Sequence, residues 1–144
     1  MVFLNINDVT FLNYLWTFEP LTFNLFTMYE LVFWIYQDGI YLNHHLVYES
    51  IVEEELVEGL EDLPTTVILN RINTLFSKWE RVDENSWKNN NGPGAFHIRT
   101  TSQSIKIDCY GTQGKTMDIL VNALEEFKCP LYDPQVPERY DGVE

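Results

Sequence analysis

The chain has 144 residues and a formal net charge of −13, because 22 acidic residues face only nine basic ones. Apolar residues make up 45% of the sequence and aromatic residues 15%, more than an acidic disordered protein contains. This composition predicts a folded acidic body and excludes binding to nucleic acid through a basic surface. We expect one globular domain over residues 1–144, with an extended C-terminal tail over residues 130–144.

The charges are unevenly distributed along the chain. The first basic residue is Arg71, and the 70 residues before it contain 11 acidic side chains. A surface with one sign of charge repels phosphate backbones and attracts cationic proteins. The first half of the chain therefore indicates a basic protein partner.

The cysteine content and the N-terminal sequence favour a cytoplasmic protein. Cys109 and Cys129 are the two cysteines, too few for a disulfide framework and typical of a reducing compartment. The N-terminus lacks the basic residues that begin a secretory signal. No apolar run approaches the roughly 18 residues of a membrane span. We therefore expect neither secretion nor a membrane partner.

The first predicted elements are a helix and several strands. Apolar spacing predicts a short helix over residues 7–18. Alternation over residues 21–25 and a β-branched and aromatic run over residues 31–36 predict strands. An Asp-Gly pair at residues 38–39 predicts a hairpin turn that pairs the second of these strands with residues 40–42.

Two helices are expected next, over residues 45–63 and 65–80. Pro64 closes the first, and Thr65 or Thr66 can cap the second. The apolar stripe of the second helix consists of Ile68, Ile72, Leu75, Phe76 and Trp79.

The second half of the chain predicts strands and one more helix. A possible strand lies at residues 81–88, and a clear hairpin pairs residues 95–101 with residues 105–110. A last helix is expected over residues 116–127. Because strands and helices occur in blocks, we expect an α+β fold, with a mostly antiparallel sheet backed by three or four helices.

The register of the predicted hairpin tests a possible thiol and imidazole pair. A tight turn at residues 102–103 places Phe96 opposite Cys109 and His97 opposite Asp108. Cys109 then lies on the apolar face of the sheet and His97 on the other. The sequence therefore argues against a catalytic dyad of these two residues.

The other face of the same hairpin carries polar side chains. His97 lies beside Asp108, and Arg99 lies beside Lys106. This pattern is typical of an ordinary solvent-exposed face, and a ligand site is the alternative.

Seven acidic residues within 14 positions form the sharpest local feature. They are Glu49, Glu53, Glu54, Glu55, Glu58, Glu61 and Asp62. On the expected helix, like charges four residues apart would each weaken it by a few tenths of a kcal/mol. The cluster is either a docking surface for a basic partner or a solvated face that keeps the protein soluble.

Two other patterns fit known chemistry poorly. His44, His45 and Glu49 could contribute to a metal site, but a further ligand is missing and no HExxH pattern is present. Residues 111–116 end in Gly-Lys-Thr, as a phosphate loop does, but Cys109 stands where that loop needs its first glycine. We therefore expect no metal or other cofactor, and a tight turn before a helix.

In general character the chain is similar to the acidic immunity proteins of bacterial toxin systems, which are small, strongly negative and intracellular. The resemblance is one of composition and transfers no residue. It implies a non-enzymatic inhibitor that covers the cationic active site of a nuclease-type toxin. The charge pattern itself, not the resemblance, points to the seven acids as the binding residues.

Two alternatives remain open. One is a structural or adaptor subunit of an oligomeric assembly, with a homo-oligomer as one form of it. The other is a small enzyme or ligand binder that uses the face of His97 and Asp108, or the cluster of His44, His45 and Glu49.

Overall fold

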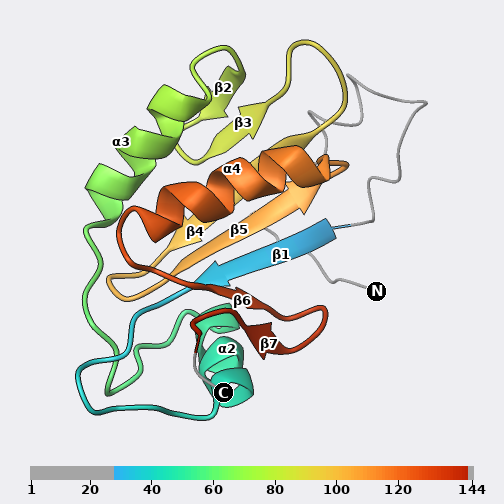
Figure 1. Ribbon diagram of the computed structural model, residues 1–144. Coiled ribbons are helices and arrows are strands. Elements are labelled where there is room, and N and C mark those ends of the chain that lie inside the picture. The colour runs from blue at the N-terminus through green and yellow to red at the C-terminus, as the bar shows by residue number, and fades with distance from the viewer. Residues whose placement is uncertain (1–27, 143–144) are drawn as a thin grey trace.

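The computed structural model describes residues 28–142, so the helix expected at 7–18 and the strand expected at 21–25 lie outside the described residues. The described part contains three helices and an antiparallel seven-stranded sheet in the order β2-β3-β4-β5-β1-β6-β7 (Figure 1). This arrangement confirms the expected α+β fold. The strands are β1 (Met28–Phe33), β2 (Glu80–Asp83), β3 (Ser86–Lys88), β4 (Ala95–Thr100), β5 (Ile105–Tyr110), β6 (Leu131–Asp133) and β7 (Glu138–Arg139). The helices are α2 (His44–Val52), α3 (Thr65–Leu75) and α4 (Gly114–Glu125).

Helices cover both faces of the sheet. Leu31 and Phe33 of β1 belong to the core beneath α3 and α4. Val32 and Trp34 point to the opposite face, where α2 packs. Figure 1 shows α3 and α4 in front of the sheet and α2 beside β6 and β7. The continuous apolar run around β1 is therefore explained by burial on both faces.

The larger core lies under α3 and α4. Ile68 and Ile72 of α3, and Leu120 and Leu124 of α4, are fully buried against the sheet. Each large apolar side chain that is removed from water in this way stabilises the fold by about 1.5–3 kcal/mol. Ile68 and Ile72 belong to the apolar stripe that predicted α3, and they confirm that part of it. Leu75 of the same stripe is 38% exposed and does not belong to the core.

The predicted register of the central hairpin is confirmed. Phe96 pairs with Cys109 and His97 pairs with Asp108 across β4 and β5. The turn is closed by the hydrogen bond from the Thr101 backbone N–H to the Ser104 carbonyl oxygen, at 3.1 Å.

The long acidic helix expected over residues 45–63 is wrong. Helix α2 ends at Val52, and Glu54 then adopts a left-handed conformation with φ of +57°. A continued helix would have set Glu54, Glu58 and Asp62 on one face at repulsive spacing. The chain avoids this repulsion by leaving the helix.

The segment after α2 is tied down by specific contacts instead. The Gln103 side chain accepts a hydrogen bond from the backbone N–H of Val57 at 2.9 Å and donates one to its carbonyl oxygen at 3.0 Å. Leu60 is fully buried and forms an antiparallel bridge with Tyr36. Residues 53–62 therefore form an ordered loop with outward-facing acids.

Other expected boundaries also change. The turn at residues 38–39 is present, but residues 40–42 form no strand, because Tyr36 pairs with Leu60 instead. Helix α3 is shorter than the expected 65–80, and Pro64 takes its N-cap position without a side-chain hydrogen bond. The region expected as one strand at 81–88 is the hairpin β2–β3.

The last helix and the tail are also defined by the structure. Helix α4 begins two residues before the expected start, at Gly114. The tail beyond residue 130 contributes β6 and β7 to the sheet. Among the described helices, none has both the length and the apolar character that a membrane span requires.

Candidate functional site

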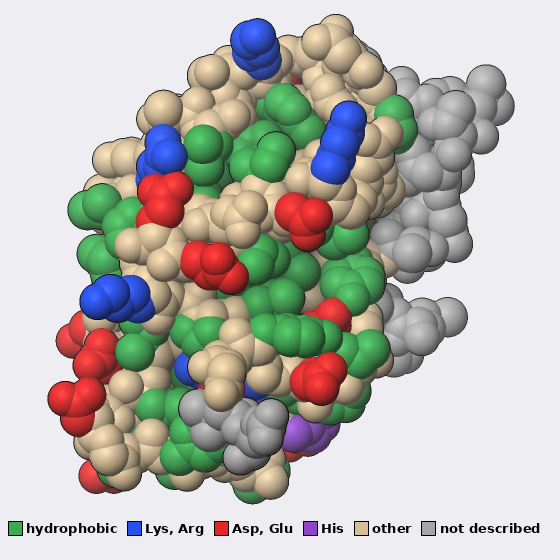
Figure 2. All heavy atoms as spheres, viewed as in Figure 1, with side chains coloured by type: hydrophobic (Ala, Val, Ile, Leu, Met, Phe, Trp, Pro, Cys, Tyr) green, Lys and Arg blue, Asp and Glu red, His purple; other side chains and the backbone are tan. Residues whose placement is uncertain are grey.

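The seven predicted binding residues form an exposed acidic surface on α2 and the loop that follows it. Glu49, Glu53, Glu54, Glu55, Glu58, Glu61 and Asp62 are all exposed. We call these seven residues the acidic surface. On the face drawn in Figure 2, a group of acidic side chains lies at the lower left, in the region of the segment between α2 and α3.

Internal ion pairs leave most of the acidic surface unneutralised. Glu49 lies 3.3 Å from Nε2 of His45, one turn earlier on α2. Within residues 28–142, no ion pair joins the other six carboxylates to a basic side chain. Their charge is therefore directed to solvent or to a partner.

Large apolar side chains are exposed among these acids. Leu46 is 60% exposed and Leu56 is 67% exposed. An open hollow of about 500 Å³ lies on α2. It is lined by Leu46, Tyr48, Glu49, Ser50, Val52, Glu53 and Glu55. An apolar patch that is rimmed by polar residues is a common feature of protein–protein contact sites.

A second apolar edge borders the acidic surface. The backbone N–H of Gln37 donates to the carbonyl oxygen of Gly59 at 2.8 Å, which holds the loop of residues 37–43 against the acidic loop. Gly59 has φ of +104°, and a Cβ there would lie 2.9 Å from Cγ2 of Ile40. This close approach leaves Ile40 and Leu42 partly exposed beside the acids.

The two histidines of the proposed metal cluster face different partners. Nδ1 of His44 lies 2.7 Å from the Tyr36 hydroxyl oxygen, whereas His45 contacts Glu49 and, at 3.2 Å, the hydroxyl of Tyr132. In the described part of the chain, no group of three His, Cys, Asp or Glu residues is placed to hold a metal ion.

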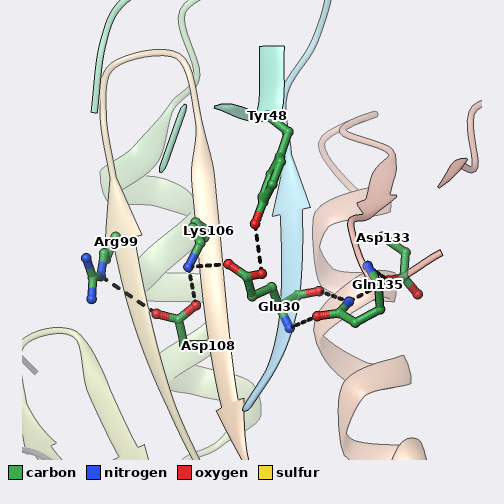
Figure 3. A network of polar contacts seen from close by, with 7 residues as sticks. All are labelled: Glu30, Tyr48, Arg99, Lys106, Asp108, Asp133 and Gln135. Carbon is green, nitrogen blue, oxygen red and sulfur yellow. Dashed lines mark hydrogen bonds and ion pairs between the residues drawn. The ribbon is translucent and has the colours of Figure 1, made fainter. Parts of the chain in front are cut away.

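The polar face of the central hairpin is not the solvent-exposed surface that its sequence pattern suggests. Asp108 is fully buried and Lys106 is 8% exposed. Nζ of Lys106 lies 2.8 Å from a carboxylate oxygen of Glu30 and also forms an ion pair with Asp108 (Figure 3). Nε of Arg99 lies 3.7 Å from the other oxygen of Asp108. We call Glu30, Arg99, Lys106 and Asp108 the buried charge network.

The buried charge network contains two acids and two bases, so its formal charges balance. Burial raises the pKa of Asp108, whereas Lys106 and then Arg99 oppose that increase. A buried carboxylate is stable only when such partners compensate for the lost water. The network is therefore an interdependent unit, and removing one member leaves another without its counter-ion.

Tyr48 joins the buried charge network to the acidic surface. Its hydroxyl donates to Oε2 of Glu30 at 2.8 Å, and its ring forms part of the hollow on α2. Val47 and Ile51 bury the inner side of the same helix. Helix α2 is thus positioned by two apolar anchors and by this hydrogen bond.

The side chain of Gln135 forms hydrogen bonds with the backbone of Glu30 in β1. Its amide accepts from the Glu30 backbone N–H at 2.7 Å and donates to the Glu30 carbonyl oxygen at 2.9 Å. It also contacts Asp133, which accepts a hydrogen bond from the hydroxyl of Tyr29 (Figure 3 shows the Gln135 contacts). That bond and burial raise the pKa of Tyr29 to about 12. The side-chain amide therefore forms the two hydrogen bonds to the Glu30 backbone that a neighbouring strand would otherwise form.

Tyr48→Phe is expected to lower the free energy of unfolding by about 1–3 kcal/mol, because the partly buried carboxylate of Glu30 loses a hydrogen bond. Urea denaturation monitored by tryptophan fluorescence measures this change. The matched control is Tyr140→Phe, which removes a hydroxyl from a side chain that is 53% exposed. Equal effects of the two variants would show that the Tyr48 contact does not position α2.

The cysteines are expected to be unreactive in the native protein. Burial raises the pKa of Cys129 to about 12, and it raises the pKa of Cys109 as well. Cys109 belongs to the core beneath α3 and α4. Its cross-strand partner is Phe96, and because His97 is the next residue of the same strand, His97 lies on the opposite face of the sheet. Ellman's reagent should label both thiols only after denaturation, since the thiolate is the reactive form. Rapid labelling of the native protein would contradict this prediction.

Comparison with known proteins gives no family assignment. No protein-family model matches the chain, and a search of the curated proteins finds no match.

Sequence reasoning identified the acids correctly as outward-facing but missed the burial of Lys106 and Asp108. One signal could have revealed it. The unbroken apolar run over residues 31–36 is typical of a strand covered on both faces. The strand that pairs with it, β5, is then expected to be covered on both faces too, which would bury Lys106 and Asp108.

Proposed function

We propose that this protein is a small acidic inhibitor of the immunity type, which neutralises a basic nuclease-type toxin by covering its cationic active site. The observation that carries this proposal is the exposure of Leu46 and Leu56 among seven carboxylates, six of which have no basic partner in the described chain. Interfaces combine such apolar anchors with charged surroundings.

The physical basis of inhibition would be charge imitation. A nuclease binds the phosphates of its substrate through Lys and Arg side chains. The carboxylates of the acidic surface would pair with those side chains and exclude the substrate. Long-range attraction would accelerate the encounter, and burial of the apolar anchors would slow dissociation.

The order of the loop favours this mechanism over a purely solvating role. Gln103 holds both backbone groups of Val57, and Leu60 is buried in the α2 core. A preformed loop loses less conformational entropy when it binds than a flexible acidic segment does. The acids would therefore present a fixed pattern to the partner.

The proposal is tested with the product of the reading frame beside this gene. That product is purified with and without the present chain, and its nuclease activity is measured in both states. We expect stoichiometric inhibition that weakens as salt is added, because screening reduces attraction between exposed charges. A neighbouring product without nuclease activity, or one that keeps full activity in the presence of the chain, would contradict the proposal.

A further inference from the structure

His44, the first residue of α2, lies between two tyrosine hydroxyls. Its Nδ1 is 2.7 Å from Oη of Tyr36, and its Nε2 is 3.0 Å from Oη of Tyr41. The imidazole also stacks on the Tyr36 ring and lies 6.2 Å from the Trp34 ring centroid. Both ring nitrogens therefore have a hydrogen-bonding partner.

Each tyrosine has a second possible acceptor, and this fixes the direction of the hydrogen bonds. Oη of Tyr41 lies 3.0 Å from Oδ2 of Asp141 and donates its proton there, because a carboxylate can only accept. The Tyr41 oxygen must then accept from Nε2–H of His44. In neutral His44, Nδ1 is consequently an acceptor.

The hydroxyl of Tyr36 can donate its proton to either of two acceptors. Its hydroxyl oxygen lies 2.7 Å from Nδ1 of His44 and 3.2 Å from the carbonyl oxygen of Leu42. The shorter separation favours donation to the neutral imidazole. When His44 gains a solvent proton at Nδ1, that nitrogen becomes a donor and the Tyr36 proton turns to Leu42. Both protonation states can thus complete the chain of hydrogen bonds.

The C-terminal strand is held at the same place. Cζ of Arg139 lies 4.7 Å from the ring centroids of both Trp34 and Tyr36. Nε of Arg139 donates to Asp141 at 2.9 Å, and Nη2 donates to the Trp34 carbonyl oxygen at 3.1 Å. Strand β7 has only two residues, so these contacts contribute much of its attachment. We call Arg139 and Asp141, together with the contacts of Arg139 to Trp34 and Tyr36, the C-terminal latch.

We propose that His44 is a proton-dependent switch that opens the C-terminal latch at acidic pH. A protonated His44 places a second positive charge against the rings that hold Arg139, and it competes with Arg139 for the negative charge of Asp141. Repulsion between the two cations then weakens the attachment of β7. This inference stands independently of the proposed binding function.

The charges around His44 give the direction of the pH effect. Burial lowers the pKa of His44, Arg139 lowers it further, and Asp141 opposes this decrease. Among residues 28–142, the remaining titratable groups that face the ring are the hydroxyls of Tyr36, Tyr41 and Tyr132, and burial raises the pKa of each. These phenols therefore stay neutral at physiological pH.

A lowered histidine pKa means that the closed latch binds the proton more weakly than the open one. The closed state is fully favoured above the ordinary histidine value of about 6.5. It loses that advantage as the pH falls through the lower pKa of the closed state.

Hydrogen exchange of the full chain tests the switch. The Tyr140 amide donates to the Leu131 carbonyl oxygen at 2.8 Å and reports directly on β7. Between about pH 7.5 and pH 5, where histidines titrate, its protection factor should fall. At low pH, the fold decrease of this protection factor approaches the acid dissociation constant of His44 in the closed state divided by that in the open state. Protection of the Ile107 amide, in the central strand β5, should stay constant.

Two variants isolate the histidine responsible. His44→Asn keeps an oxygen that can accept from Tyr36 but does not titrate, so Tyr140 protection should become independent of pH. His45→Asn is the matched control and should retain the decrease. A constant protection factor in the wild-type chain, or a decrease that persists in His44→Asn, would overturn the proposal.

Imidazole ¹⁵N chemical shifts of the wild-type chain provide a test that needs no variant. At neutral pH, His44 should carry its proton on Nε2, and acidification should protonate Nδ1. A neutral form with its proton on Nδ1 would contradict the hydrogen-bond directions on which the switch depends.

Discussion

Lys106→Met is expected to lower the free energy of unfolding by about 3–5 kcal/mol at neutral pH, because it leaves a buried charge without its partner. Lys106 is the ammonium group that contacts both Glu30 and Asp108. Methionine preserves most of the side-chain volume but supplies no charge. Urea denaturation monitored by circular dichroism measures the loss. Lys115→Met, at an exposed lysine, should change stability by no more than about 0.5 kcal/mol.

The pH dependence of this loss identifies its cause. In the native protein Lys106 counteracts the effect of burial on the pKa of Asp108, so the substitution raises that pKa further. A raised carboxyl pKa contributes stability below the unfolded value of about 3.9, which is lost as the pH rises through the folded value. The difference between Lys106→Met and the wild type should therefore shrink as the pH falls from neutral.

A double-mutant cycle with Asp108→Asn separates charge from packing. If the two residues act as a buried pair, the double variant loses less stability than the sum of the single variants. Additive losses, or a Lys106→Met loss that does not change with pH, would show that Lys106 contributes mainly through packing.

Sequence periodicity predicted the parts of the fold in which side-chain pattern and backbone geometry agree. The alternation of β4 and β5 predicted the pairing of Phe96 with Cys109, because one register alone gathers the apolar residues on one face. The stripes of α3 and α4 similarly predicted Ile72 and Leu120 as core residues.

The end of α2 could not be predicted from sequence periodicity. Leucine spacing continues past Val52, but the break depends on non-local contacts, namely the Gln103 side chain on Val57 and the pairing of Tyr36 with Leu60. Repulsion among the glutamates acts in the same direction. The network around Asp108 is likewise non-local, because Lys106 also pairs with Glu30 of β1, which accepts a hydrogen bond from Tyr48 of α2.

If the proposed inhibition of a basic nuclease is correct, charge reversal of Glu53, Glu54 and Glu58 to Lys is expected to abolish it while leaving the fold intact. All three side chains are exposed and form no ion pair with the described basic residues. The substitutions place like charges against the cationic cleft, and each such contact opposes binding by several kcal/mol where it is desolvated. Because every 1.4 kcal/mol changes affinity about tenfold, we expect a loss of at least about 1,000-fold.

A matched variant separates position from net charge. Reversal of Glu84, Asp118 and Glu125 to Lys also changes the charge by six units, at three exposed sites outside the acidic surface. Its effect should be limited to a modest decrease in association rate, since distant charges act through a screened field. Circular dichroism and thermal unfolding verify that both triple variants are folded.

The decisive measurement is the affinity of these two triple variants for the proposed nuclease partner, the product of the neighbouring reading frame, at one salt concentration. We expect that reversal on the acidic surface removes binding and that reversal elsewhere leaves the affinity within about tenfold of the wild type. Equal losses in the two variants would show that only bulk charge matters. Undiminished binding of the variant at Glu53, Glu54 and Glu58 would show that the acidic surface is not the binding site.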